Sequence, residues 1–243
     1  MSNSEEISVR IDYTEAVLLG SWDTLKDYIK RMETQLVQAT KNFEKWEKSQ
    51  LAELPPEKHE EFREAFVEEY INYYREFPRI LYNSLLVSAC SLLEYQLGVI
   101  CRKIKADKGI PISWSDLKGE ALARAKLYCK LGKLEVSGDE PVWQEIDNYF
   151  DVRHCIVHCN GLVDEYREKD RKSLVSYLER KSIIGKEPFE ETKIVELNSQ
   201  FCEEVVGEMQ KFIILFIKHM LNRKSEWRSP YTSSLSKRGS GLR

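Results

Sequence analysis

The chain has 243 residues, of which 42% are hydrophobic and 32% are charged. A globular chain of this length buries roughly 70% of its unfolded surface, so it needs neither a metal nor a disulfide to fold. Its formal net charge of −3 excludes a broadly basic nucleic-acid coat, but leaves room for an enzyme that handles one or two phosphates in a local cleft.

The first two elements are expected to be long amphipathic helices. Apolar residues recur three, four and seven positions apart over Tyr13–Lys48, which is typical of a helix with one buried face. Pro55 and Pro56 end this helix, and Glu57–Glu76 follows with an aromatic stripe that favours a core over a base-stacking surface. We expect residues 1–79 to form an N-terminal helical extension packed on the main domain.

A third helix is expected to begin at Pro78 and run to about Lys108. It contains Ile80–Cys101, the longest weakly charged run in the chain, which also includes Glu94 and Gln96. Such polar groups are costly in lipid. We therefore predict the central buried helix of a bundle rather than a membrane span.

The N-terminal sequence gives no indication of export. MSNSEEISVRIDY lacks the basic and apolar regions of a secretory signal. The six cysteines are then expected to be reduced thiols in a cytoplasmic protein.

The second half of the sequence predicts further helices and one short hairpin. The hairpin strands would be Ile183-Ile184 and Ile194-Val195, two β-branched pairs on either side of GKEPFEETK. The expected helical segments are Asp116–Leu131, Pro141–Asn160, the charged and partly helical Leu162–Arg180, and Asn198–Asn222.

The predicted fold class is all-α: a multi-helix bundle with long N-terminal helices and at most one small β-hairpin. Residues 80–222 would form the main helical domain. Residues 223–243 are rich in Ser, Lys, Arg and Gly, and we expect them to be a disordered tail.

The residues that suit chemistry gather at the end of the Pro141–Asn160 helix, in DVRHCIVHCNG. His154 and His158 are one helical turn apart, and an imidazole exchanges protons near neutral pH. The guanidinium of Arg153 fits phosphate oxygens and can stabilise charge on phosphorus. Because RNA supplies its own 2′-hydroxyl nucleophile, these groups predict phosphodiester cleavage without a metal.

The segment RHCIVHCNG resembles the signature of the HEPN superfamily, in which Arg, a polar residue, three further residues and His close a helix. The preceding SACSLLEYQLGVICRKI resembles the neighbouring helix of bacterial members, so the similarity covers about Ile80–Leu221. The resemblance implies a homodimer whose Arg–His pairs share one cleft. It also implies an endoribonuclease that leaves a 2′,3′-cyclic phosphate and a 5′-hydroxyl, with a role in phage defence or beside an antitoxin or another partner protein.

Carried onto this chain, the resemblance makes Arg153 the phosphate-stabilising residue and His158 the general acid/base. His154 takes the polar position after Arg and would orient or assist. Glu94 resembles an acidic residue that some members place near the pair, and Asn160 would touch the substrate. Members controlled by a nucleotidyltransferase antitoxin often carry Tyr where Asn160 stands, so control by modification of that tyrosine is not expected.

A zinc site is the chemical alternative. His154, Cys155, His158 and Cys159 offer two ligand pairs, each one turn apart. On an ideal helix the two pairs point about 100° apart, so one zinc cannot easily take all four side chains. We expect no metal and no cofactor.

Two further interpretations need no catalysis. Arg153 could form an ion pair with Asp151 or Glu145, while His158 could interact with the helix dipole. A HEPN domain could also be a non-catalytic RNA-binding or partner-binding module of a defence complex.

Overall fold

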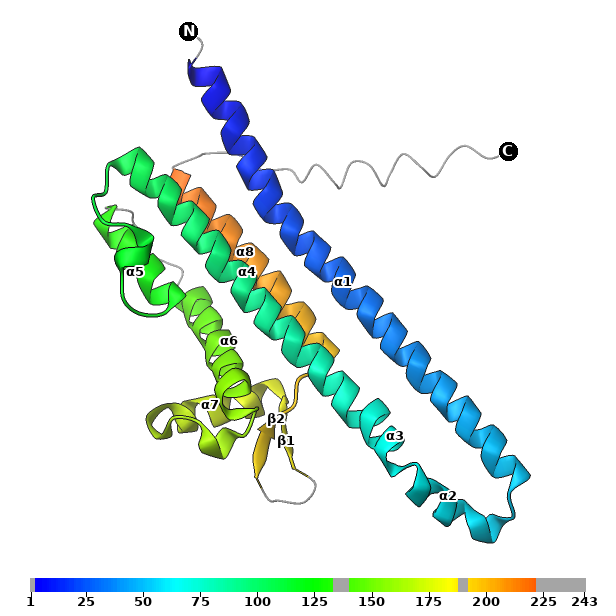
Figure 1. The fold of residues 1–243 in the computed structure, drawn as a ribbon. Coiled ribbons are helices and arrows are strands. Elements are labelled where there is room, and N and C mark those ends of the chain that lie inside the picture. Colours follow the sequence, from blue (N-terminus) through cyan, green and yellow to red (C-terminus); the bar gives the residue numbers. More distant parts are fainter. Residues whose placement is uncertain (1–2, 133–139, 188–191, 222–243) are drawn as a thin grey trace, which may run out of the picture.

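The computed structural model describes residues 3–132, 140–187 and 192–221 (Figure 1). Helices dominate these residues and a two-stranded antiparallel sheet accompanies them, which confirms the predicted all-α class with a small hairpin. The predicted tail, residues 223–243, lies outside the described residues. The elements are α1 (Asn3–Glu53), η1 (Pro56–Lys58), α2 (His59–Ala65), α3 (Val67–Ile71), η2 (Asn72–Glu76), α4 (Phe77–Lys108), η3 (Trp114–Asp116), α5 (Ala121–Leu131), α6 (Glu140–Cys159), η4 (Val163–Glu165), α7 (Glu168–Lys181), β1 (Ile184–Lys186), β2 (Lys193–Val195) and α8 (Ser199–Leu221).

Helix α4 is the centre of the bundle and packs against α1, α5, α6 and α8 (Figure 1). One continuous hydrophobic cluster joins these helices and includes Trp22 of α1, Leu93 of α4, Trp143 of α6 and Phe212 of α8. The N-terminal helix is therefore part of the same core as the segment that carries the Arg–His motif. The boundary expected between residues 79 and 80 falls inside α4.

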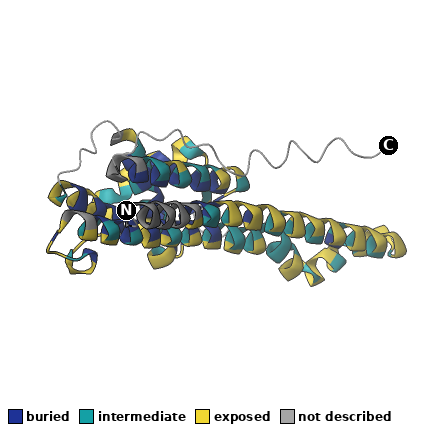
Figure 2. Cartoon of the chain, turned by 90° about the horizontal axis from the view of Figure 1, so that it is seen from above, coloured by how far each residue is buried: buried dark blue, intermediate teal, exposed yellow. Residues whose placement is uncertain are grey.

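The second half of α1 extends past the bundle and pairs with α2, α3 and η2 as a helical arm (Figures 1 and 2). Aromatic rings fill its seam: Phe43 and Tyr73 stack at 4.8 Å, and Trp46 meets Phe66 edge-on at 4.9 Å. The aromatic stripe is thus a packing surface, as predicted. The single helix expected over residues 57–76 is instead interrupted at Phe66, where ψ rises to 22°.

Helix α5 begins five residues later than predicted. The backbone N–H of Ser113 donates to the carboxylate of Asp116 at 2.9 Å, but this cap closes only the 3-10 turn η3. Gly119 then adopts a φ of 105°, which a side chain would resist, and α5 starts at Ala121. The predicted range therefore joined the short turn η3 to the helix α5.

Among the described residues, the helical stretch Val67–Ala106 is long and apolar enough to cross a bilayer, judged by length and composition alone. Of its most apolar 18-residue window, 56% is buried inside the protein. The core helix of a bundle passes the same test, and α4 holds that position here.

Gln96 of α4 is 1% exposed and joins two helices through its amide. It accepts a hydrogen bond from the Trp22 indole at 2.7 Å and donates one to the Leu18 carbonyl at 2.7 Å. We expect Gln96→Leu to lower the free energy of unfolding by about 2 kcal/mol in denaturant titrations, because it leaves a buried indole N–H without an acceptor. Gln38→Leu, on the exposed face of α1, should change it by less than about 0.5 kcal/mol. Equal stabilities for the two variants would contradict this role of Gln96.

Candidate functional site

Helix α6 ends at Cys159 because the next two residues, Asn160 and Gly161, adopt left-handed φ angles of 49° and 82°. The Gly161 N–H donates to the Cys155 carbonyl at 3.1 Å, which closes the last turn. The Gly161 carbonyl accepts from the Val195 N–H at 2.9 Å, which ties the helix end to β2. The end of α6, and the residues of the predicted motif with it, are therefore fixed by backbone hydrogen bonds.

An open cavity of about 290 Å³ lies beside this last turn. The rings of His154 and His158 lie 5.8 Å apart, centroid to centroid, with their planes tilted by 41°. His154 is half-buried and His158 is exposed. The two imidazoles therefore share one face, as the spacing predicts. The cavity is lined by Glu120, His154, His158, Cys159, Glu165, Tyr166 and Arg167.

Glu120, immediately before α5, faces His154: its Oε1 lies 3.7 Å from Nδ1 of the ring. Burial lowers the pKa of His154 below its ordinary 6.5, the Glu120 carboxylate opposes that shift, and the charges of Arg153 and Arg167 add to it. The ring of His154 is therefore uncharged at neutral pH and able to accept a proton.

Arg153 does not line this cavity, although it is only one residue from His154. It is half-buried and makes no hydrogen bond or ion pair with the part of the chain that the structure describes. Burial raises the pKa of Cys90 on α4 to about 12, and the charge of Arg153 opposes this shift as it adds to that of His154. Asp151 and Glu145 both pair with other cations, so neither of the expected ion pairs forms.

Glu94 and Asn160 also lie outside the residues that line the cavity. The Glu94 carboxylate pairs with Nη2 of Arg124 at 2.6 Å, which links α4 to α5. Its charge raises the pKa of Cys90 while that of Arg153 lowers it, so the two charged groups lie around one thiol without pairing. Asn160 is exposed at the helix terminus.

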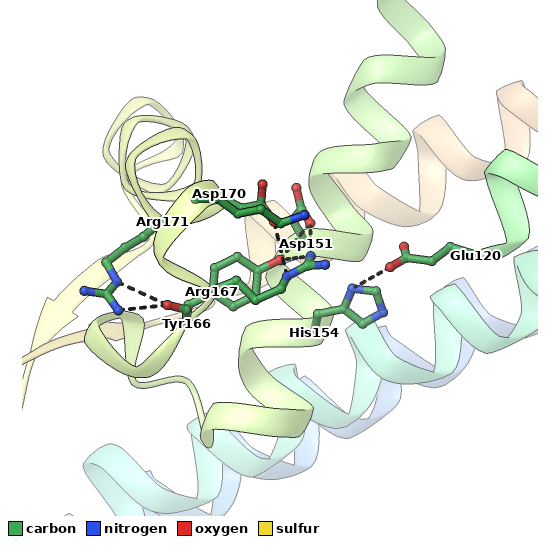
Figure 3. A network of polar contacts seen from close by, with 8 residues as sticks. Glu120, Asp151, His154, Tyr166, Arg167, Asp170 and Arg171 are labelled. Atoms are coloured by element: carbon green, nitrogen blue, oxygen red, sulfur yellow. Dashed lines mark hydrogen bonds and ion pairs between the residues drawn. The ribbon is translucent and has the colours of Figure 1, made fainter.

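Tyr166 and Arg167, in the connection between η4 and α7, also line the cavity. Figure 3 shows the polar contacts that hold them. Nη2 of Arg167 donates to the Tyr166 hydroxyl at 2.7 Å and to Asp151 at 3.2 Å, and Nε lies 3.3 Å from Asp170. The Tyr166 hydroxyl itself donates to Asp151 at 2.8 Å. The sequence pattern did not single out these residues, because Arg167 lies in a run of alternating charges where no single arginine stands out.

The four-ligand zinc arrangement is not formed. Cys155 is fully buried, and its thiol contacts the Leu162 carbonyl at 3.8 Å instead of lining the cavity with the histidines. In the described ranges, no group of three or more His, Cys, Asp or Glu side chains is positioned to hold an ion.

Comparisons with known proteins leave the family open. No protein-family model, no curated protein and no solved structure matches the chain. The HEPN resemblance therefore remains a prediction that depends on the segment from Arg153 to Gly161.

We expect the ring of His154 to titrate below 6.5 in NMR spectra recorded across the acidic range. Glu120→Gln should lower this pKa further, because it removes the opposing negative charge, whereas Glu165→Gln on the same cavity wall should leave it unchanged. Since the unfolded chain would bind this proton more readily, His154 should also make the fold less stable as the pH falls below 6.5. A pKa at or above the ordinary value would contradict the assignment.

Proposed function

We propose that the protein is a metal-independent endoribonuclease, a toxin or a phage-defence effector. The observation that carries this proposal is the pair of imidazoles, His154 and His158, on one wall of an open cavity. Two adjacent imidazoles suit a reaction in which one proton is removed and another is delivered.

In the proposed reaction a base takes the proton of the 2′-hydroxyl, and the 2′-oxygen forms a bond to phosphorus. The bond from phosphorus to the 5′-oxygen breaks, and an acid protonates that oxygen. The products are a 2′,3′-cyclic phosphate and a 5′-hydroxyl. His158 is the proposed general acid/base, and His154, neutral at pH 7 and next to Glu120, orients or assists it.

Arg153 is proposed to stabilise the charge that develops on phosphorus. Its guanidinium has no partner among the described residues, so its donors are available to a phosphate. Because Arg153 is not among the residues that line the cavity of its own chain, we propose that a second subunit brings its Arg153 beside His158. The proposed active form is therefore a homodimer.

The surface around Arg153 supports this inference. Val157, one turn after Arg153 on α6, is 45% exposed, and Tyr95, next to Glu94 on α4, is 63% exposed. Large exposed side chains of this kind are typical of interaction surfaces where they lie together. We infer that the α4–α6 face, defined by Tyr95, Arg153 and Val157, joins the two subunits.

A non-catalytic module that binds RNA or a partner protein is the second candidate. The partner-protein form of this candidate is favoured by the charge of the cavity, whose lining includes two carboxylates, Glu120 and Glu165, against one permanent cation, Arg167. Such a wall attracts polyanions weakly. Cleavage assays separate the two candidates.

We expect the purified protein to cut RNA in the presence of EDTA. Arg153→Ala and His158→Ala should each slow cutting by about 10²- to 10⁴-fold, because they remove charge stabilisation and proton transfer. Gel electrophoresis with analysis of the 2′,3′-cyclic ends measures both the rate and the chemistry. Matched controls are Arg102→Ala, exposed on α4, and His59→Ala at the start of α2, and both should cut at the wild-type rate.

Three other outcomes of the cleavage assay would contradict this proposal. Cutting that EDTA abolishes would favour a metal mechanism. RNA binding without cutting would favour the non-catalytic module. Cutting that survives both Arg153→Ala and His158→Ala would place the chemistry elsewhere in the molecule.

The dimer is tested separately by sedimentation velocity. We expect Tyr95→Glu to convert a dimer to monomers, because it sets a second carboxylate beside Glu94 within an apolar contact. Tyr28→Glu, at a tyrosine of α1 that is 50% exposed, is the matched control and should remain dimeric. A monomeric wild-type protein, or a Tyr95→Glu dimer as stable as the wild type, would rule out this interface.

A further inference from the structure

The cavity contains an arginine that the Arg–His motif does not include. Arg167, at the start of α7, lines the same wall as His154 and His158, whereas Arg153 does not. Its side chain is 46% exposed, so the guanidinium is accessible.

Three acceptors hold the Arg167 guanidinium and leave one of its nitrogens available (Figure 3). Nη2 donates to Asp151 and to the Tyr166 hydroxyl, and Nε lies beside Asp170. The plane of the group lies over the Tyr166 ring, with Cζ 5.1 Å from its centroid. Nη1 has no acceptor within the described part of the chain, and an arginine Nη carries two N–H groups.

The support of Arg167 is itself rigid. Arg171, one turn further along α7, donates to the Tyr166 carbonyl from Nη2 at 2.9 Å and from Nε at 3.2 Å. Tyr166 is 3% exposed, so the ring beneath Arg167 is fixed by packing as well. A side chain held in this way has already lost most of its rotamer freedom, and little further ordering is needed when it binds a ligand.

The neighbouring carboxylates determine what such a group can offer. Asp151 and Asp170 neutralise much of its charge, so long-range attraction is weak. Arg167 can still offer the two N–H donors of Nη1 on the cavity wall, near two imidazoles. A phosphate oxygen is the acceptor that this combination fits best.

We propose that Arg167 is a phosphate-binding residue of this cavity, which positions an RNA strand while His158 acts on the scissile bond. The identity of the ligand as RNA rests on the proposed ribonuclease function. The phosphate site itself does not. Arg153 would then act on the reacting phosphate, and Arg167 would hold the strand in place.

Inorganic phosphate and uridine 3′-monophosphate serve as probes, with the ring signals of His154 and His158 followed by NMR. Both probes should shift these signals in the wild-type protein. Arg167→Gln should weaken the binding of both by about tenfold, because a charge-assisted hydrogen bond is lost. Glutamine keeps an amide that can still donate to Asp151, and thermal unfolding checks that the fold is retained. Arg180→Gln, near the far end of α7, is the matched control and should bind as the wild type does.

The outcomes separate this inference from the proposed function. Binding of phosphate that depends on Arg167, in a protein that cuts no RNA, would support the phosphate site and refute the ribonuclease. RNA cutting with an unchanged KM in Arg167→Gln, together with unchanged phosphate binding, would refute the role of Arg167 and leave the ribonuclease intact. Absence of phosphate-induced shifts in the wild-type protein would also overturn the inference.

Discussion

The arrangement of the candidate site depends on how α6 ends. Gly161 donates backward into the helix and accepts from β2, so a single residue both terminates α6 and anchors it to the hairpin. A Cβ atom here would lie 3.4 Å from Ile194, and the φ of 82° is one that a residue with a side chain adopts rarely. Gly161 follows the final turn of α6, which contains His158, and leads into the η4–α7 connection, whose residues Tyr166 and Arg167 also line the cavity.

The buried face of α6 determines where the functional groups point. Val152, Cys155 and Ile156 are buried in the bundle, and they fix the rotation of the helix about its axis. With that rotation fixed, His154 and His158 face the cavity. Arg153, about 140° around an ideal helix from His158, is not among the residues that line the cavity. The same packing that stabilises the fold thus separates the two halves of the motif within one chain, which is why the proposed function requires a second subunit.

Local signals in the sequence predicted the elements well and the cavity only in part. The end of α4 at Gly109 and the end of α6 at Gly161 follow from glycine conformations, and the shared face of His154 and His158 follows from helical spacing. The sequence does not indicate that Glu120 neighbours His154, since the predicted helix over Asp116–Leu131 includes Glu120, whereas α5 begins only after it. Tertiary packing brings these two residues together from segments that are distant in the sequence.

Arg124 forms another tertiary contact that the sequence does not reveal. It forms an ion pair with the carboxylate of Glu94, so the partner of that glutamate comes from α5 and not from α6. Cζ of Arg124 also lies over the Trp114 ring, 4.5 Å from its centroid. Nothing in the spacing of either residue indicates this pairing. The pairing removes Glu94 from the set of free carboxylates near Arg153, and so leaves that guanidinium available.

The charge balance of the molecule limits how it could recognise RNA. The net charge of −3 and the carboxylates of the cavity wall mean that a polyanion gains little from general attraction. Pairing two subunits would double the arginines at a shared cleft, but it would double the carboxylates as well. Under the proposed function, binding would therefore come from a few directed hydrogen bonds, chiefly from Arg153 and from the immobilised Arg167. A site of this kind selects RNA by the position of its phosphates, and it would leave most nucleic acid in a cell unbound.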